Sequence, residues 1–174
     1  MNDHHPLPNE WPRAWLMTDS RFGDALWGVL ARMPAGAGVV LRDSSLGERV
    51  ARICADRGLT LAVSRDPSLA EALGAALVHN PARATALPFS RSVHDEAEAR
   101  QARAEGAALV FVSPLFATRS HPNAAPLGAD EGERLSRLSG TRAIALGGLN
   151  ADRFAEISGR GFYGWAGIDA WLNA

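Results

Sequence analysis

Residues 142–150 carry the unit that recurs along this chain: Arg-Ala-Ile-Ala-Leu-Gly-Gly-Leu-Asn. A short apolar run, 142–146, is followed by a glycine pair and then by Asn150, a residue type that commonly precedes a helix. Phe154 and Ile157 then lie at helical spacing. A strand, a tight turn and a helix in this order are typical of the repeated units around a parallel β-sheet.

Seven further short apolar runs have the length and punctuation of strands. The eight predicted strands are 14–18, 38–42, 59–63, 76–79, 87–90, 108–113, 142–146 and 161–165. Eight strands with helices between them predict an α/β fold of the (β/α)8 TIM barrel type. The alternative is an open doubly wound sheet with fewer strands.

The predicted barrel is shortened. The chain has 174 residues, below the ~200 to ~250 residues usual for this fold. About eight residues separate the fourth and fifth predicted strands. After the eighth predicted strand and the two residues that follow it, the chain continues only over residues 168–174. We therefore expect one or more helices to be missing or reduced.

Residue types that start and stop helices punctuate the segments between these runs. An acidic or amide residue begins three predicted helices, and glycine or proline ends four. The starting residues are Asp66, Asp95 and Asn150, and the stopping residues are Pro34, Gly58, Gly74 and Gly106. Asp95 with Glu98 three residues later resembles a capping box.

Composition narrows the class of protein. Hydrophobic residues make up 47% of the chain and the formal net charge is -1, which suits one globular domain over 14–174 after an irregular N-terminal arm over 1–13. No basic cluster favours nucleic acid, and no apolar run is long enough to span a membrane. Cys54 lies on an apolar stripe and is expected to be structural. We expect a cytoplasmic protein.

All 18 basic residues are arginine, because the chain contains no lysine. Chemistry that needs a lysine amine, such as a Schiff base or a Walker-type phosphate lysine, is therefore excluded. A phosphate group would have to be bound by arginine, histidine or backbone N–H groups.

In a TIM barrel, the functional residues lie at the carboxyl ends of the strands. Arg42, Arg65, His79 and Ser92 are at such positions in this sequence. Gly147 and Gly148 follow the seventh predicted strand and Gly167 follows the eighth. Loops after these two strands commonly bind phosphate in this fold, although a glycine pair alone also suits an ordinary tight turn.

The segment 113–122 is Ser-Pro-Leu-Phe-Ala-Thr-Arg-Ser-His-Pro and follows the sixth predicted strand. Thr118, Arg119, Ser120 and His121 are four consecutive side chains that can donate hydrogen bonds to phosphate oxygens. Composition alone fits an ordinary polar loop equally well.

Several of these stretches resemble the thiamine-phosphate synthases and their TenI-like relatives. Residues 113–118 are similar to the family's Gly-Pro-aliphatic-Phe-x-Thr stretch, and 143–149 to its Ala-Ile-Gly-Gly-Ile element. Further similarity, in the same order along the chain, lies at 15–19, 41–43, 73–79 and 92–94. The resemblance thus covers nearly the whole chain and implies the barrel fold.

The resemblance implies a reaction between a pyrimidine pyrophosphate and a thiazole phosphate, in which pyrophosphate leaves and the thiazole nitrogen captures the pyrimidine-methyl cation. It implies pyrophosphate contacts at Arg42 and Ser92, hydroxyl donors at Thr118 and Ser120, and thiazole-phosphate binding at Gly147 and Gly148. We add to these Arg65, Arg119 and His121 as pyrophosphate contacts, and His79 and Gly167 as phosphate contacts.

This chain departs from the family pattern at the positions that serve a metal ion. Ser64-Arg65 stands where the family has an Asn-Asp pair, and the residues after His79 lack the family's Gln and carboxylate. His121 and Ser44 stand where the family has lysines, and Val40 replaces a Gln. The family is expected to use magnesium, but its ligands are not matched, so no metal or other cofactor is assigned.

Two alternatives to a synthase stay open. One is a non-catalytic binding protein that retains the phosphate pocket. The other is a thiazole tautomerase, which the sequence disfavours because Pro114 stands where that activity needs a histidine. The expected partners are small phosphate or pyrophosphate ligands. A homo-oligomer is expected if Trp165 and Trp171 lie on an uncovered flank; the N-terminal arm with Trp11 covering that flank is the alternative.

Overall fold

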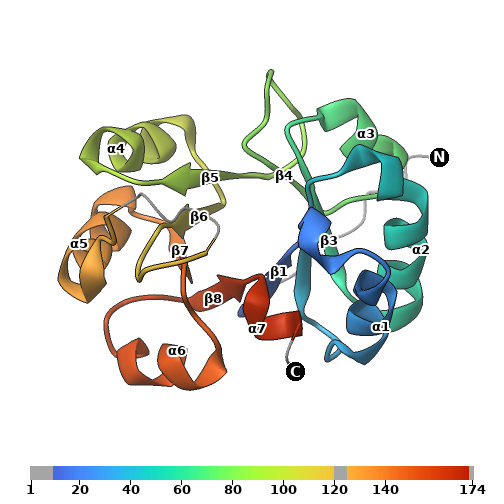
Figure 1. The fold of residues 1–174 in the computed structure, drawn as a ribbon. Helices are drawn as coiled ribbons and strands as arrows, with labels where there is room; N and C mark the ends of the chain where they lie inside the picture. The colour runs from blue at the N-terminus through green and yellow to red at the C-terminus, as the bar shows by residue number, and fades with distance from the viewer. Residues whose placement is uncertain (1–9, 120–124, 173–174) are drawn as a thin grey trace.

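The computed structural model describes residues 10–119 and 125–172. Within them, eight parallel strands form a closed barrel in sequence order, because β1 pairs with both β2 and β8 (Figure 1). This confirms the predicted barrel and excludes the open sheet. The strands are β1 (Ala14–Met17), β2 (Gly38–Leu41), β3 (Thr60–Ser64), β4 (Leu77–His79), β5 (Phe89–Val93), β6 (Leu109–Val112), β7 (Arg142–Leu146) and β8 (Gly164–Gly167).

Helices surround the barrel on its outside, as Figure 1 shows. The α-helices of the described residues are α1 (Ala25–Arg32), α2 (Gly47–Arg57), α3 (Pro67–Ala72), α4 (Glu96–Glu105), α5 (Gly128–Ser139), α6 (Ala151–Ile157) and α7 (Asp169–Leu172). Two 3₁₀ turns, η1 (Ser20–Phe22) and η2 (Ser44–Leu46), precede α1 and α2.

The predicted helix starts are confirmed by their hydrogen bonds. The side chain of Asp66 accepts from the N–H groups of Ser68 and Leu69, Asp95 accepts from Glu98 N–H, and Asn150 accepts from Arg153 N–H. Gly58 and Gly106 end α2 and α4 in the left-handed conformation. These bonds lie within a few residues of sequence, so the local sequence is enough to predict them.

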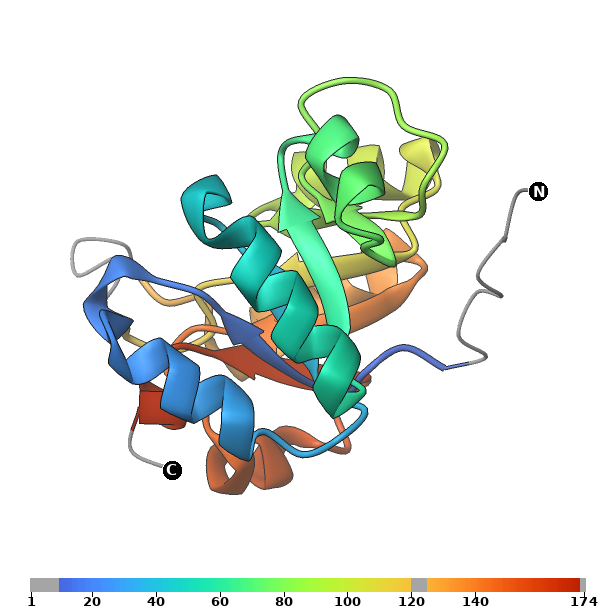
Figure 2. The same cartoon turned by 90° about the vertical axis from the view of Figure 1, so that its right-hand side faces the viewer.

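The shortening falls where the sequence predicts it. Residues 80–88, between β4 and β5, form no helix and appear as the light-green loop in Figure 2. Within the described residues, only α7, a helix of four residues, follows β8.

Two predicted strands are displaced in the structure. β5 begins at Phe89 rather than at residue 87 and extends to Val93. Its sequence is mainly polar, and the polar side chains have partners in the fold. Ser90 is completely buried and bonds to His79, and Arg91 forms an ion pair with Glu105 of α4. β8 begins at Gly164 rather than at residue 161, because Gly161 adopts a φ of 79°, which suits a turn.

Large apolar side chains fill the barrel interior. Trp15 packs edge to face against Phe111, and Trp11 joins the same cluster together with Leu109 and Ile144. Trp11 therefore packs into the barrel interior, so the alternative in which it covers the flank beside Trp165 and Trp171 is wrong. A filled interior leaves the loops at the strand ends as the place for ligands.

The short helix α7 covers the flank that sequence analysis expects to be open. Trp171 is buried, stacks on Trp165 with ring centroids 5.4 Å apart, and donates from Nε1 to the Trp15 carbonyl oxygen at 3.0 Å. Trp165 is partly exposed, and the self-association expected at these two residues stays a prediction. None of the described helices has the length and apolar character needed to cross a membrane.

Cys54 lies on the buried side of α2, within the core between helices and sheet. Burial raises the pKa of its thiol to about 12, so the thiolate is strongly disfavoured. A structural role, as predicted from its apolar stripe, agrees with this environment.

Candidate functional site

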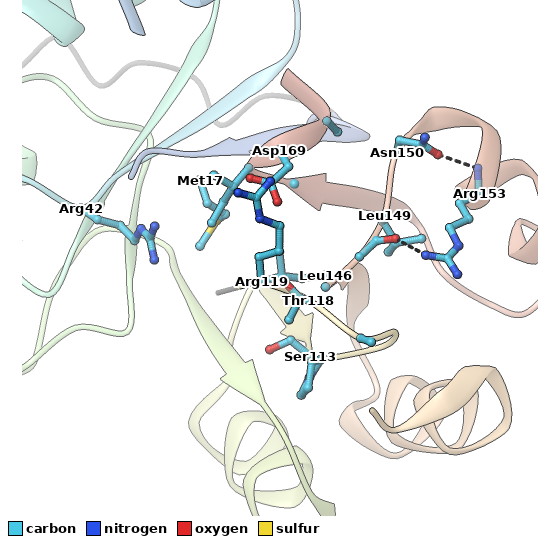
Figure 3. A pocket seen from close by; sticks show the side chains of 17 residues that line it. Met17, Arg42, Ser113, Thr118, Arg119, Leu146, Leu149, Asn150, Arg153 and Asp169 are labelled. Carbon is cyan, nitrogen blue, oxygen red and sulfur yellow. Dashed lines mark hydrogen bonds between the residues drawn. The ribbon is translucent and has the colours of Figure 1, made fainter. Parts of the chain in front are cut away.

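A cavity of about 500 Å³ opens at the carboxyl ends of the strands (Figure 3). Its walls come from β1, the segments that follow β2 and β6, and the ends of β7 and β8 with their loops. Of the residues singled out from the sequence, it contains Arg42, Thr118, Arg119, Gly147, Gly148 and Gly167. The structure therefore brings together six predicted site residues that lie up to 125 positions apart in the sequence (42 to 167). We refer to it as the first cavity.

Gly147 and Gly148 allow the loops after β6 and β7 to approach each other closely. Their φ angles are 103° and 64°, which favour glycine. A Cβ on Gly147 would lie 2.9 Å from Pro114 Cα, and one on Gly148 would lie 2.6 Å from the Ala117 carbonyl oxygen. The glycine pair therefore has a structural reason as well as a proposed binding role.

The amide groups of these glycines are available to a ligand. The Gly147 carbonyl accepts from Phe116 N–H at 3.1 Å, which ties the two loops together. Within the described chain, neither the Gly147 nor the Gly148 N–H has a hydrogen-bond acceptor, although Gly147 is buried. Buried amides are normally paired, so two unpaired amides at a cavity wall indicate a site for a hydrogen-bond acceptor such as a phosphate oxygen.

The charged side chains of the first cavity are mostly cationic. Arg42, Arg119 and Arg153 contribute three guanidinium groups, and Asp169 contributes the one carboxylate among the lining residues that the structure describes. In Figure 3, Arg42 and Arg153 lie on opposite sides of the view and Arg119 lies between them. Asp169 accepts from Arg21 Nη1 at 3.0 Å, so its charge is partly balanced outside the cavity. This arrangement favours an anion.

Asp19 and Thr18 hold the Arg42 side chain. Arg42 Nη2 donates to Asp19 Oδ2 at 2.6 Å, Nε donates to the Thr18 carbonyl oxygen at 2.5 Å, and Nη1 has no acceptor among the described residues. Burial by itself would raise the pKa of Asp19, but hydrogen bonds from Arg21 and the charges of Arg21 and Arg42 outweigh it and lower that pKa. Asp19 therefore stays ionised and positions Arg42.

The structure places Arg65 and Ser92 in a second cavity of about 380 Å³, at the ends of β3, β4 and β5. Arg65 has a φ of 70° and no ion-pair partner within the described residues. Arg65 and Ser92 thus line a different cavity from Arg42 and Arg119, with which the sequence analysis groups them. The roles predicted for them stay predictions.

His79 lines neither cavity. Its ring is 4% exposed and packs edge to face on Phe111, with centroids 5.0 Å apart. Burial, with a contribution from the positive charges of Arg42 and Arg91, lowers the pKa of His79 to about 4. The structure thus places His79 in the barrel interior as a neutral imidazole, and the phosphate contact expected for it stays a prediction.

A hydrogen-bond network defines which nitrogen of His79 carries the proton. Asn80 Oδ1 accepts from Ser92 N–H at 2.8 Å, so Asn80 Nδ2 is the donor that faces Ser92 Oγ at 2.9 Å and His79 Nε2 at 3.3 Å. His79 Nε2 must then be the acceptor, and Nδ1–H donates to Ser90 Oγ at 2.9 Å. The network holds Ser92 at the edge of the second cavity, where its Oγ also lies 3.5 Å from His79 Nε2.

The described residues do not fit the magnesium ion that the family resemblance implies. They contain no group of three or more His, Cys, Asp or Glu side chains that could hold a metal ion. At the end of β3 the chain places Arg65, whose positive charge repels a divalent cation. No catalytic step is therefore derived through a metal.

Two predicted site residues, Ser120 and His121, lie outside the described residues. The first cavity is also lined by Arg153, Asp169 and Met17, none of which was predicted from the sequence. The helix start at Asn150 was a usable signal for Arg153, because it places this residue in the first turn, close to the Gly147-Gly148 loop. Met17 ends a strand and carries no polar group that would have singled it out.

Fold and site together define the class: a TIM barrel with a cationic cavity at the carboxyl ends of its strands. Residues 43–171 match the family model described as thiamine monophosphate synthase, TMP-TENI, and the chain belongs to this family.

Curated relatives carry related names. A thiamine-phosphate synthase from Thermobifida fusca is 28% identical over 176 residues, covering 87% of this chain and 81% of the relative. One from Chloroflexus aurantiacus is 34% identical over 84 residues, covering 48% of this chain and 39% of the relative. The alignments with two other relatives, 35% and 30% identical, span 44% and 29% of those proteins. The chain thus spans less than half of most of these relatives.

Solved structures show the same fold. A thiamine phosphate pyrophosphorylase from Pyrococcus furiosus superposes with a TM-score of 0.76 at 19% identity, covering 93% of this chain and 88% of the other. One from Bacteroides thetaiotaomicron gives a TM-score of 0.61 at 20% identity, covering 93% and 85%. An HpcH/HpaI aldolase from Burkholderia cenocepacia reaches a TM-score of 0.64 at 15% identity, so this likeness concerns the fold alone.

Proposed function

We propose that this chain is a synthase of the thiamine-phosphate type, which joins a pyrimidine pyrophosphate to a thiazole phosphate and releases pyrophosphate. The observation that carries the proposal is the first cavity, which is lined at the strand ends by two unpaired glycine amides and three guanidinium groups. Membership of the family and the T. fusca relative support the substrate class.

In the proposed reaction, the bond between the pyrimidine methylene carbon and the pyrophosphate oxygen breaks, and its electron pair leaves with the pyrophosphate. The nitrogen lone pair of the thiazole then forms the new carbon–nitrogen bond, and the positive charge ends on the thiazolium ring. No proton is gained or lost in these two steps. The protein has to stabilise the charge that develops on the departing pyrophosphate.

Arg42 and Arg119 are the residues proposed to perform that stabilisation. Both line the first cavity, and Arg42 is positioned by Asp19 and the Thr18 carbonyl with its Nη1 group still available. Gly147 and Gly148 are proposed to bind the thiazole phosphate through their amides. Thr118, on the wall between these groups, is proposed as a hydroxyl donor.

The test is product formation by the purified protein from the two substrates, with magnesium and with a chelator in separate reactions. Thiamine phosphate and pyrophosphate in equal amounts are the expected products. Arg42→Gln is expected to lower turnover about 100-fold, the usual cost of one electrostatic donor. Arg100→Gln, at an exposed arginine that pairs with Glu96 on α4, is the matched control and should leave turnover unchanged. No product above background under either condition would refute the synthase.

A non-catalytic binding protein is the second candidate. It is favoured by the position of Arg65 and Ser92, which line a second cavity rather than the one that contains Arg42. Calorimetry separates the two candidates: saturable binding of the thiazole phosphate without conversion supports the binding protein, whereas conversion removes it.

A further inference from the structure

Arg153 lies at a position where its own helix does not stabilise a positive charge. It lies in the first turn of α6, where the partial positive charge of the helix end disfavours a cation. The side chain nevertheless reaches the wall of the first cavity. Its location therefore needs an explanation from outside the helix.

Two contacts without opposite charge hold the Arg153 guanidinium in place. Its carbon lies 4.5 Å from the centroid of the Phe116 ring. Its Nη1 donates to the Gly148 carbonyl oxygen at 2.9 Å, one of the dashed bonds in Figure 3. Phe116 belongs to the loop after β6 and Gly148 to the loop after β7. Arg153 thus bridges the two loops that form this side of the cavity.

No carboxylate of the described residues lies within ion-pair distance of Arg153. The neighbouring basic residues differ: Arg160 pairs with Asp130 and Glu133, and Arg134 pairs with Glu131 and Glu96. The charge of Arg153 therefore stands unbalanced beside the unpaired amides of the glycine loop. A guanidinium group has five N–H donors, and only one of them is used here.

We infer that Arg153 binds the phosphate group of the ligand in the first cavity, together with the amides of Gly147 and Gly148. The Phe116 ring and the Gly148 carbonyl hold the guanidinium group at the cavity wall, and its remaining N–H groups are proposed to donate to two oxygens of one phosphate. This inference rests on the proposed ligand class but not on turnover.

The experiment is calorimetric titration of the wild-type chain and of Arg153→Gln with the thiazole phosphate, the unphosphorylated thiazole alcohol and inorganic phosphate. Arg153→Gln is expected to weaken the thiazole phosphate and inorganic phosphate about 10- to 100-fold, the usual effect of losing hydrogen bonds to a charged group. The alcohol should bind both proteins equally. Arg160→Gln is the matched control, because Arg160 follows the same helix but forms ion pairs away from the cavity.

Other outcomes overturn the inference. If Arg153→Gln lost the same affinity for the thiazole phosphate and for the alcohol, Arg153 would only hold the two loops together. If the affinity for phosphate were unchanged, Arg153 would not contact the ligand. Failure of the wild-type chain to bind either phosphate would also remove the inference. Tight phosphate binding that depends on Arg153 without product formation would remove the synthase and leave the inference standing.

Discussion

Acid should destabilise this protein through His79. The imidazole is buried against Phe111, and its pKa in the fold is about 4, against an ordinary value of 6.5. Between these two pH values the unfolded chain binds a proton that the folded chain excludes, so the free energy of unfolding rises with pH. The contribution is complete above pH 6.5 and is lost as the pH falls to about 4. The difference between the two pKa values corresponds to about 3 kcal/mol in the free energy of unfolding.

The assay is urea denaturation of the wild-type chain and of His79→Gln across pH 4 to 7. Carboxylates titrate in both proteins, so the difference between the two isolates His79. The wild-type free energy of unfolding should rise with pH more steeply than that of the variant, by about 1.4 kcal/mol per pH unit in the middle of the range.

Nitrogen chemical shifts of His79 give a second measurement that does not depend on the stability of a variant. At pH 5.5 the ring should be neutral with its proton on Nδ1, as the Asn80 network requires. A ring that titrates near 6.5, or parallel slopes for wild type and His79→Gln, would refute the reasoning.

Three further outcomes follow from the same structure. Gly148→Ala should lower the free energy of unfolding by more than the roughly 1–2 kcal/mol expected for an alanine in the left-handed conformation. Gly74→Ala, with the same φ of 64° but open space around it, should lower it by only about that amount. Equal losses of the two variants in urea denaturation would contradict the crowding around Gly148. Asp19→Asn should tighten inorganic phosphate binding most at low salt, because it removes the negative charge that pairs with Arg42 at the cavity; weaker or salt-independent binding would count against this. Trp171→Phe should cost about 1 kcal/mol for its lost hydrogen bond, whereas Trp171→Ala should cost about 3–5 kcal/mol in thermal unfolding.

The sequence by itself determined the barrel and most of its helix starts and stops. Apolar runs of strand length report burial on both faces of a parallel sheet, and that burial does not depend on knowing the partner strand. Helix starts such as Asp66, Asp95 and Asn150 act over two or three residues, so their hydrogen bonds could be foreseen. The order of strands then placed Arg42, Thr118, Gly147 and Gly148 at one end of the barrel.

Tertiary structure alone decided how the residues at that end are divided. Strand order says which residues reach the mouth, but side-chain packing decides which cavity each one lines, and it separated Arg65 and Ser92 from Arg42. β5 begins two residues later than predicted for the same reason, since its buried Ser90 accepts a hydrogen bond from His79 instead of extending an apolar pattern. The helix start at Asn150 indicates where Arg153 lies, but only the folded structure gives its contacts with a ring and a carbonyl from two different loops. Contacts between distant segments depend on three-dimensional proximity, which a local pattern of residues does not encode.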